Sequence, residues 1–514
     1  MLSISFIISV INITHYFVKE GGARMGNIFT DIYQENEQGE RVYKTLINGC
    51  WDCVTVTDKF TVTNPATGEE IAQVPSCSAQ DVKNAIKAAD EFEEWANYKP
   101  VERLNVMEEA ADILEEHQTE VRDIIIQEAG KPLSVAEGEV EATIERLKLT
   151  LQEVRALYGE YIPGEWVEDT QNKFAIVRRK PLGIVAAIGP FNYPLFITAA
   201  KIIPAVLAGN TVVAKPSSET PLSLLYFVRI LEAAGMPKGT INVVTGSSSN
   251  IGDPLIQDEA IDAVTFTGST GVGEYIADQV GVKKLHLELG GNAAAIVLND
   301  ADLDNAVQHI CKGAFKNSGQ RCDAMSRVLV QKDIKEEFME RLMEEAANYE
   351  VGDPFDEDTL VGPLINHGAV KRVDQLVQDA IDGGAEVLRG AQYDGNFYEP
   401  TILDNVTLDM DIAWEEIFGP VLPIIEVEDH HQALDIANRS EYGLDSSIFT
   451  ENITIALRLS KEMEDGTVSI NAAPSHGVGH FPFGGNKRSG IGREGLKYSI
   501  DELTKINTVI FNEK

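Results

Sequence analysis

Basic residues are scarce in this chain: 43 Lys and Arg stand against 81 Asp and Glu in 514 residues, a net charge of −38. A surface of this sign repels the phosphates of nucleic acids and anionic lipid headgroups, so we expect neither nucleic acid nor a membrane as a partner. The acidic residues are spread along the whole chain. This spread favours solubility in a salt-rich, halophilic cytoplasm over a specific acidic surface for one partner.

Cysteine is scarce as well, because the chain holds only Cys50, Cys53, Cys77, Cys311 and Cys322. An odd number at irregular spacing does not predict a disulfide framework, and it fits a reducing, cytoplasmic compartment. The C-x-x-C pattern of Cys50 and Cys53 stands alone in INGCWDCVTV, which is typical of a turn that leads into a strand. Successive side chains of a strand alternate between faces, so these two cysteines need not meet. We therefore expect no metal or redox role for them.

Long hydrophobic runs are missing too. The apolar stretch LSISFIISVI near the start is too short to span a bilayer, and no Lys or Arg precedes it. A second methionine, Met25, opens MGNIFTDIYQ, which looks like the true beginning of the folded chain. We expect residues 1–24 to be an extension outside the fold, or the result of a wrongly assigned start.

The patterns that are present predict an α/β fold. Apolar residues three and four apart predict helices between residues 82 and 157. Short, β-branched, almost wholly apolar runs then alternate with helical segments, which is typical of a parallel, doubly wound sheet. The first series comprises residues 183–189, 211–215, 241–246 and 263–268. The second comprises residues 293–298, 324–331, 421–427, 446–450 and 467–471. We therefore expect two doubly wound lobes that join near residues 286–292.

A long polar β-hairpin is predicted between the helices and the first sheet, at residues 161–180. A protruding hairpin of this kind often adds a strand to another subunit. Together with the tail at 495–514 it predicts an oligomerisation element. A homo-oligomer follows, and the sequence leaves dimer and tetramer open.

Two motifs carry groups suited to nucleophilic chemistry. In NSGQRC, Gly319 gives backbone freedom and Arg321 gives positive potential, which would lower the pKa of the Cys322 thiol. In LELGG, Glu288 closes an apolar strand and is followed by two glycines. Burial there would raise the pKa of Glu288 toward that of a general base. A buried inert cysteine and an ordinary acid at a strand end are the alternatives.

Two further motifs suit ligand binding. Asn192 in GPFNYP (residues 189–194) follows a buried strand, where its amide can face a developing oxyanion, although asparagine is also a common turn residue. The glycine-rich FTGSTGVG (residues 266–273) suits a pyrophosphate on backbone N–H groups. It does not follow the G-x-G-x-x-G order.

The order of these motifs resembles the aldehyde dehydrogenase superfamily, from about Ile47 to the C-terminus. The resemblance rests on GPFNYP, AKPSSETP, FTGSTGVG, LELGG, GQRC, EEIFGPV, YGL and FGGNKRSGIGREG. It implies a dinucleotide-binding domain at residues 25–160 and 181–289 and a catalytic domain at 290–494. Residues 161–180 and 495–514 would be the oligomerisation element.

The resemblance also implies the catalytic roles. Cys322 would attack the aldehyde and pass through a thiohemiacetal to a thioester. The Asn192 side chain and the Cys322 backbone N–H would hold the oxyanion. Glu288 would activate the water that hydrolyses the thioester, so that the product is a free acid.

The implied cofactor is NADP or NAD. NAD-preferring relatives often carry a glutamate three positions after the lysine of this motif, and here that position is Ser218. A hydroxyl beside Lys215 can accept a 2′-phosphate that a carboxylate would repel, which favours NADP, although Glu219 is adjacent. The expected cofactor-binding residues are Pro190, Phe191, Lys215, Ser218, Gly246, Gly268, Ser269, Gly273, Leu289, Glu416 and Phe418.

Within the superfamily, the chain most resembles the archaeal type of non-phosphorylating glyceraldehyde-3-phosphate dehydrogenase. GQRCDA, WEEIFGPVLPI, SHGVGHFPFGG and SGIGREGLKYSI carry this resemblance. It implies an anionic small-molecule aldehyde bound by Tyr193, Arg321, His476 and Phe483.

The chain also departs from that pattern. Bacterial members bring a further arginine to the phosphate, and Ala142 stands in its place here, with Arg146 one turn on. Succinate semialdehyde, 2-oxoglutarate semialdehyde and lactaldehyde are therefore alternative substrates. A non-catalytic structural protein on the same scaffold is a remote alternative, since the chain keeps all three catalytic residues.

Overall fold

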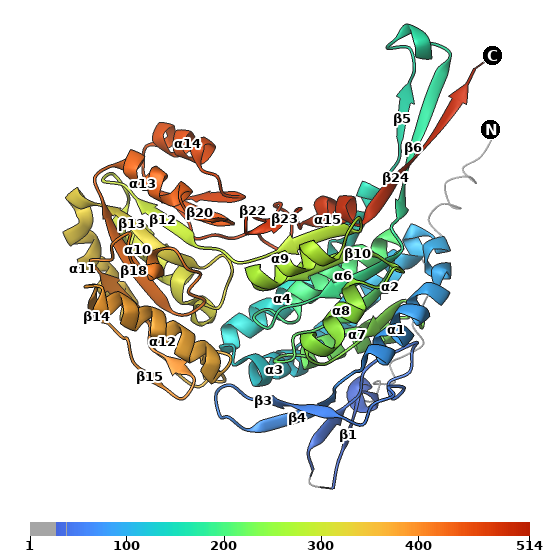
Figure 1. Ribbon diagram of the computed structural model, residues 1–514, viewed down its shortest axis with the longest axis horizontal. Coiled ribbons are helices and arrows are strands. Elements are labelled where there is room, and N and C mark those ends of the chain that lie inside the picture. The colour runs from blue at the N-terminus through green and yellow to red at the C-terminus, as the bar shows by residue number, and fades with distance from the viewer. Residues whose placement is uncertain (1–26, 38, 514) are drawn as a thin grey trace, which may run out of the picture.

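The computed structural model describes residues 27–37 and 39–513, and the expectation for residues 1–24 lies outside them. Figure 1 shows two α/β lobes side by side and a narrow ribbon of long strands that projects from one end. In the described part of the chain, no helix has both the length and the apolar character needed to cross a bilayer.

The first lobe is built on a six-stranded sheet with the order β23-β11-β10-β7-β8-β9. Its strands are β7 (Ile184–Ile188), β8 (Thr211–Lys215), β9 (Ile241–Val243), β10 (Ile261–Thr267), β11 (Lys284–Glu288) and β23 (Gly490–Ile491). The first five are parallel, and β23 pairs antiparallel with β11. Apolar runs without alternation thus become strands buried on both faces, as the sequence predicts.

Helices cover both faces of this sheet. Ile184 and Ala186 of β7 pack against one layer, and Val185 and Ala187 pack against the other. The first layer contains α1 (Ala79–Glu91), α8 (Ser248–Ile256) and α9 (Thr270–Gln279). The second contains α2 (Pro100–Glu116), α3 (Gln118–Ala129), α4 (Leu133–Lys148), α6 (Phe196–Ala208) and α7 (Leu222–Ala233). The doubly wound expectation is confirmed for this lobe.

The second lobe has a seven-stranded sheet with the order β14-β17-β18-β13-β12-β20-β21. Its strands are β12 (Ala293–Val297), β13 (Met325–Gln331), β14 (Glu386–Arg389), β17 (Thr401–Asp404), β18 (Val421–Val427), β20 (Asp445–Phe449) and β21 (Thr467–Ile470). Only the β14–β17 pair in it is antiparallel. One face packs on α10 (Leu303–Phe315) and α11 (Lys335–Ala346). The other packs on α12 (His367–Asp382), α13 (His430–Asn438) and α14 (Ile453–Glu462).

The junction between the two sheets is short and sets their relative position. Strand β11 ends at Glu288, and β12 begins at Ala293, so four residues carry the chain from one sheet to the other. The carboxyl edge of the first sheet therefore lies next to the amino edge of the second. Loops that leave the first sheet and loops that enter the second meet at this boundary.

The projecting ribbon in Figure 1 is a three-stranded antiparallel sheet of β5 (Glu160–Pro163), β6 (Lys173–Pro181) and β24 (Thr504–Asn512). Strand β24 pairs with β6 over its whole length. The sheet carries exposed apolar side chains, among them Ile162 on β5 and Ile506 and Ile510 on β24. The expected hairpin is present, and the C-terminal tail forms its third strand.

Short elements complete the fold. They include α5 (Thr150–Val154), α15 (Leu496–Glu502), β15 (Tyr393–Asp394), β16 (Phe397–Tyr398), β19 (Tyr442–Gly443) and β22 (Asn486–Lys487). A four-stranded sheet near the N-terminus was not expected from the sequence. It consists of β1 (Tyr33–Glu35), β2 (Arg41–Tyr43), β3 (Lys59–Thr63) and β4 (Glu70–Pro75).

The interpretation of the C-x-x-C segment was wrong. Cys50 and Cys53 form a disulfide with their Cα atoms 5.7 Å apart. The reason is local: the chain turns twice between Ile47 and Asp52, and no strand begins until Lys59, so the side chains do not alternate between faces. The free cysteines of the described chain are Cys77, Cys311 and Cys322.

Candidate active site

The carboxyl edge of the first sheet collects many of the polar and glycine residues singled out in the sequence. The loop after β7 carries Asn192, and Lys215 is the last residue of β8. Gly246 follows β9, Gly268 follows β10, and Glu288 is the last residue of β11. Parallel strands end at the same edge of a sheet, so five separate segments meet there, as ligand sites in open α/β sheets require.

The amino edge of the second sheet supplies the nucleophile candidate from the opposite side. Cys322 stands three residues before β13, and Phe418 stands three residues before β18. A Cβ at Gly291, in the junction between the sheets, would collide with the carbonyl oxygen of Cys322. The junction after Glu288 therefore runs directly past the Cys322 backbone, and the structure brings Asn192, Glu288 and Cys322 to the facing edges of the two sheets.

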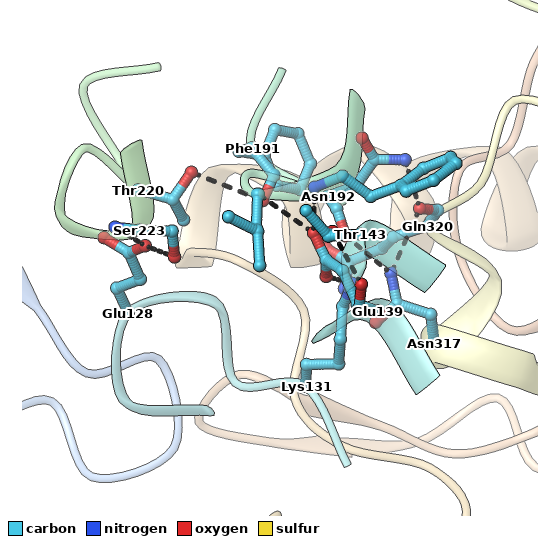
Figure 2. Close-up of polar contacts among 12 residues, drawn as sticks. Glu128, Lys131, Glu139, Thr143, Phe191, Asn192, Thr220, Ser223, Asn317 and Gln320 are labelled. Carbon is cyan, nitrogen blue, oxygen red and sulfur yellow. Dashed lines mark hydrogen bonds and ion pairs between the residues drawn. The ribbon is translucent and has the colours of Figure 1, made fainter. Parts of the chain in front are cut away.

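The side chain of Asn192 is buried and oriented by the turn that precedes Cys322. Its Nδ2 donates to the carbonyl oxygen of Gln320 at 2.8 Å, as Figure 2 shows. Asn317 Nδ2 donates to the carbonyl oxygens of Asn192 and Gln320 at 3.3 and 3.4 Å. Asn317 and Ser318 have φ values of 54° and 56°, an uncommon left-handed conformation that these contacts hold in place. The amide is thus fixed beside the segment that carries the thiol.

A buried carboxylate fixes the loop on the other side of Asn192. Glu139 Oε1 accepts hydrogen bonds from the backbone N–H groups of Leu195 and Phe196 at 2.9 and 3.0 Å. Its second oxygen pairs with Lys131, as Figure 2 also shows. The ammonium of Lys131 lies 3.5 Å from the ring centre of Tyr193. These contacts form a polar support under the loop, and Tyr193 is part of it.

The electrostatic expectation for Cys322 was wrong. Its side chain is partly buried, and burial raises the pKa of the thiol well above its usual value, with further increases from Asp323, Asp445, Glu416 and Glu288. Arg321 does not offset them, because its guanidinium pairs with Asp323 at 2.8 Å. The resting group is therefore a thiol, and a neighbouring base has to remove its proton.

Glu288 has the environment expected of a base. Its side chain is only 2% exposed, and burial, followed by the nearby charge of Glu494, raises its pKa well above the usual carboxyl value. Oε1 lies 3.0 Å from Nε2 of His286. Oε2 is buried and has no hydrogen-bond partner among the described residues. One oxygen is therefore held by the protein, and the other is available to a ligand or a water molecule.

Residues at the ends of β8 and β9 form a polar site that fits a phosphorylated ribose. Lys215 is buried, burial lowers its pKa to about 8, and the contact recorded for its Nζ is the carbonyl oxygen of Pro216 at 3.3 Å. Ser218 Oγ donates to the carbonyl oxygen of Gly246 at 3.1 Å. Glu219 accepts a hydrogen bond from Asn366 at 3.2 Å, which directs its carboxylate toward the second lobe.

The glycine-rich turn after β10 presents a helix terminus. Ser269 is the N-cap of α9 and makes no side-chain capping hydrogen bond, so the first N–H groups of this ten-residue helix are open to an anion. Gly268 N–H donates to the carbonyl oxygen of Glu288 at 3.1 Å. A Cβ at Gly273 would collide with the side chain of Leu289, so both residues contribute to packing of α9 on the strand end.

Aromatic and acidic residues border the boundary between the lobes. The rings of Phe191 and Phe418 meet edge to face with centroids 5.7 Å apart, and Pro190 precedes the first of them. Glu416 Oε1 accepts from the Gly291 N–H at 3.2 Å, and burial raises the pKa of Glu416 to about 7. Glu416 therefore holds the junction residue Gly291, which lies against the Cys322 backbone.

The residues expected at the substrate end include one histidine paired with a buried acid. His476 Nε2 lies 3.2 Å from Asp445 Oδ1, and its ring is 4.4 Å from that of Phe483. Burial lowers the pKa of His476, but the hydrogen bond and charge of Asp445 outweigh burial, and the net pKa is raised. His476 therefore carries positive charge to higher pH than a free histidine.

Arg146 does not fill the place left by Ala142. It is buried, it pairs with Glu153 at 2.5 Å, and its Nη1 donates to the carbonyl oxygen of Val478 at 3.0 Å. This contact anchors the loop that carries His476. Arg146 thus supports the substrate loop from behind.

The sequence analysis missed several buried polar residues of the site. His286, Lys201 and Glu494 lie behind Glu288, and Asp445 lies behind His476. A signal for His286 was present, because a histidine two positions before Glu288 in a strand shares its face. Within residues 27–37 and 39–513, no cluster of three or more His, Cys, Asp or Glu side chains has the arrangement of a metal site.

Comparison with known proteins gives concordant matches. Residues 54–509 match the model of the aldehyde dehydrogenase family. An NADP-dependent glyceraldehyde-3-phosphate dehydrogenase from Streptococcus equinus is 40% identical over 472 residues, 91% of this chain and 98% of that protein. A lactaldehyde dehydrogenase from Methanococcus aeolicus is 39% identical over 474 residues, 91% of this chain and 100% of that protein.

A solved structure matches equally well. The crystal structure of NADP-dependent glyceraldehyde-3-phosphate dehydrogenase from Bacillus halodurans C-125, complexed with NADP, superposes with a TM-score of 0.90 at 40% identity. The match covers 92% of this chain and 99% of that one.

Proposed function

The chain belongs to the aldehyde dehydrogenase family and is an NAD(P)-dependent aldehyde dehydrogenase, and from that premise we propose that it oxidises an anionic aldehyde to the free acid. Our first candidate is glyceraldehyde 3-phosphate, which would yield 3-phosphoglycerate without phosphorylation. The observation that carries the proposal is the meeting of Asn192, Glu288 and Cys322 at facing edges of the two sheets. Each of the three groups has a distinct task there.

The first task is to form the covalent bond to the aldehyde. Cys322 is protonated at rest, because burial and nearby carboxylates raise its pKa. The charge of Glu288 is close enough to Cys322 to raise the pKa of the thiol, and the pKa of Glu288 itself is raised, which makes its carboxylate a stronger base. We therefore assign to Glu288 the removal of the thiol proton. The sulfur then attacks the carbonyl carbon and gives a thiohemiacetal, and Glu288 releases the thiol proton to solvent before the hydrolysis step.

The second task is to stabilise the negative charge on the carbonyl oxygen. Asn192 Nδ2 has two N–H bonds, and the carbonyl oxygen of Gln320 takes one of them. We propose that the other donates to the oxyanion together with the Cys322 backbone N–H. The contacts from Asn317 hold both donors before substrate arrives, so little reorganisation is needed.

The third task is hydrolysis of the thioester. Oε2 of Glu288 lacks a partner and is therefore the oxygen best placed to take a proton from water. The water oxygen bonds to the acyl carbon, the carbon–sulfur bond breaks, and the Cys322 sulfur regains a proton. The carboxylic acid is released.

We propose NADP as the cofactor, which accepts the hydride when it is bound. Lys215 and Ser218 would hold the 2′-phosphate, because no acidic side chain of the described residues pairs with Lys215 and because Asn366 holds Glu219. The open N-terminus of α9 at Ser269 would receive the pyrophosphate. The crystal structure of the Bacillus halodurans relative is complexed with NADP, which supports the choice of this cofactor.

We propose that Arg321 and His476 bind an anionic substrate through N–H groups that donate to it, because nearby carboxylates offset their net charge. Each is paired with a carboxylate, Asp323 and Asp445 respectively. Lactaldehyde, the substrate named for the Methanococcus aeolicus relative, is the main alternative, since Ala142 removes one expected cation. Succinate and 2-oxoglutarate semialdehydes are further alternatives, because a carboxylate needs less positive charge than a phosphate.

A side-by-side assay at high KCl tests the proposal. Reduction of NADP and of NAD is followed at 340 nm with glyceraldehyde 3-phosphate, lactaldehyde and succinate semialdehyde. We expect the highest kcat/KM with glyceraldehyde 3-phosphate and NADP. A higher kcat/KM with lactaldehyde would identify lactaldehyde as the preferred substrate. If no aldehyde led to reduction of either cofactor, the proposed function would be refuted.

We further propose a domain division and an assembly. Residues 25–160 and 181–289 would bind the dinucleotide, and residues 290–494 would carry the nucleophile. The ribbon at 161–180 and 495–514 would join subunits into a homodimer or homotetramer, because its apolar side chains are exposed in the single chain.

A cytoplasmic location is proposed, because Cys322 must stay reduced to act.

A further inference from the structure

His286 occupies a distinctive place beside the proposed base. It is the third residue of β11, two positions before Glu288, so both side chains project from the same face of the strand. The imidazole is buried, and both of its nitrogens have partners. Nε2 lies 3.0 Å from Glu288 Oε1, and Nδ1 lies 3.1 Å from Thr265 Oγ1 on the neighbouring strand β10.

The charged groups around His286 come from several elements. Glu494 Oε1 lies 3.9 Å from Nδ1, and the same carboxylate pairs with Lys201 of α6 at 2.6 Å. Arg493 and Lys284 add positive charge nearby. Burial has the largest effect on the pKa of His286 and lowers it, and the three cations lower it further, Lys201 most of them. The negative charge of Glu494 raises the pKa, but the net value falls to about 4. The imidazole is therefore neutral at physiological pH.

A neutral imidazole has one N–H group, and its partners determine which nitrogen carries it. The Thr265 hydroxyl can donate to Nδ1, which leaves the proton on Nε2. That N–H then donates to Oε1 of Glu288. The strand pairing of Thr265 with His286 fixes this arrangement, because the two residues are register partners.

The two oxygens of Glu288 are therefore unequal. Oε1 accepts the imidazole N–H, whereas Oε2 is buried and without a partner in the described chain. A buried acceptor of this kind needs a ligand or a water molecule to satisfy it. The side chain of Glu288 cannot exchange its oxygens without breaking the bond to His286.

We propose that His286 is a positioning residue for thioester hydrolysis, which holds Oε1 of Glu288 so that Oε2 takes the proton of the attacking water. The inference rests on the proposed function. In this step one O–H bond of water breaks and its proton passes to Oε2, while the water oxygen bonds to the acyl carbon. The carbon–sulfur bond then breaks, and the proton returns from Glu288 to the Cys322 sulfur.

Several charged side chains line the space behind His286. A small cavity there is lined by Lys201, Thr265, His286, Arg493, Glu494 and Glu502, with smaller residues between them. A Cβ at Gly492 would lie 2.7 Å from Cδ2 of the imidazole, so the ring has little freedom to turn. The environment thus favours one orientation of His286 and, through it, one orientation of Glu288.

Two substitutions separate the contacts of the imidazole. In His286→Gln the amide nitrogen replaces Nε2 and can still donate to Glu288. In His286→Asn the shorter amide reaches only the position of Nδ1 and keeps the Thr265 contact. His431→Asn, at an exposed position on α13, is the matched control. Thermal unfolding of each variant shows whether the fold is retained.

Burst kinetics with glyceraldehyde 3-phosphate and NADP distinguish the outcomes. We expect His286→Asn to lower the steady-state rate roughly ten- to hundredfold and to slow the first turnover by less, with acyl-enzyme visible by mass spectrometry. His286→Gln should recover most of the loss. Because an N–H donor stabilises the ionised carboxylate, the pH profile of hydrolysis should move to higher pH in the Asn variant alone.

Other outcomes overturn the inference. Unchanged steady-state rates in both variants would show that His286 does not act through Glu288. Equal losses of burst and steady state in both variants would indicate a structural role only. Absence of any burst in the unmodified protein, with every aldehyde, would instead defeat the proposed function itself.

Discussion

Arg321 and Asp323, the residues on either side of Cys322, form an ion pair of 2.8 Å. The pair cancels the positive charge that an arginine would otherwise place beside the sulfur. Burial and acidic neighbours then determine the pKa of the thiol, which is raised. Activation of Cys322 therefore depends on a base and on pH, and the resting enzyme is protected from adventitious oxidation.

The first prediction concerns this pair. A raised thiol pKa means that the thiolate fraction grows as pH rises, so the rate of alkylation by iodoacetamide should increase from neutral to alkaline pH. Asp323→Asn removes an acid that raises the pKa of Cys322 and releases Arg321. The alkylation profile should shift to lower pH in this variant. Asp333→Asn, at an exposed site, is the control, and a profile unchanged by Asp323→Asn would contradict the argument.

The second prediction concerns the nucleophile. Cys322→Ser should lower kcat by roughly three orders of magnitude or more, because the hydroxyl is a far weaker nucleophile. Binding of NADP, measured by titration calorimetry, should be preserved. Replacing both Cys50 and Cys53, which form the disulfide, with serine should leave kcat unchanged. Comparable activity of Cys322→Ser and the unmodified protein would remove Cys322 from the mechanism.

The third prediction concerns the base. Glu288→Gln keeps the shape of the side chain but cannot accept a proton from water. Steady-state turnover should fall by about 10²–10⁴. If the thiol proton can leave by another route, acyl-enzyme accumulates; if not, the burst disappears as well, and either result places Glu288 in the reaction. Glu259→Gln, on the surface, serves as the reference, and turnover equal to that reference would exclude Glu288 as a base.

The fourth prediction concerns the cofactor. Ser218→Glu places a carboxylate beside the proposed 2′-phosphate site. The KM for NADP should rise at least roughly tenfold, because a like-charge contact costs more than about 1.4 kcal/mol. The KM for NAD should stay the same or fall. Ser134→Glu, on exposed helix α4, controls for added charge, and an unaltered ratio of the two KM values would argue against this site.

The fifth prediction concerns assembly. Ile506 and Ile510 are 65% and 62% exposed on β24. Charged side chains there would have to lose water on association, so Ile506→Lys with Ile510→Lys should weaken the oligomer roughly tenfold or more. Analytical ultracentrifugation measures the change. Val282→Lys, also fully exposed, should have no effect. If the unmodified protein sedimented only as a monomer, the ribbon would not be an oligomerisation element.

Most of the fold was accessible from the sequence. Runs such as residues 211–215 and 421–427 coincide with β8 and β18, because strands buried on both faces must be continuously apolar. The positions of Asn192, Glu288 and Cys322 at strand ends also followed from that pattern. Their chemical roles came from the resemblance to a family and stay predictions.

The rest depended on contacts between distant segments. Lys201, His286 and Glu494 are far apart in the chain, and no local pattern indicates that they share a cluster. The ion pair of Arg321 could have been predicted, because its partner Asp323 is only two residues away in GQRCDA. Its effect was missed because the charge of one residue was considered without that of its neighbour. Burial then reversed the expected direction of the pKa of Cys322.

Strand β23 has a consequence for how the molecule can move. The chain leaves the first sheet at Glu288, builds the entire second sheet, and returns at Gly490 to pair with the strand that it left. The two halves are thus connected twice at the same place, and rotating them apart would break the backbone pairing on which Glu288 is mounted. Rotation of the two halves is therefore restrained at Glu288, and we expect turnover to rely on movement of side chains and loops.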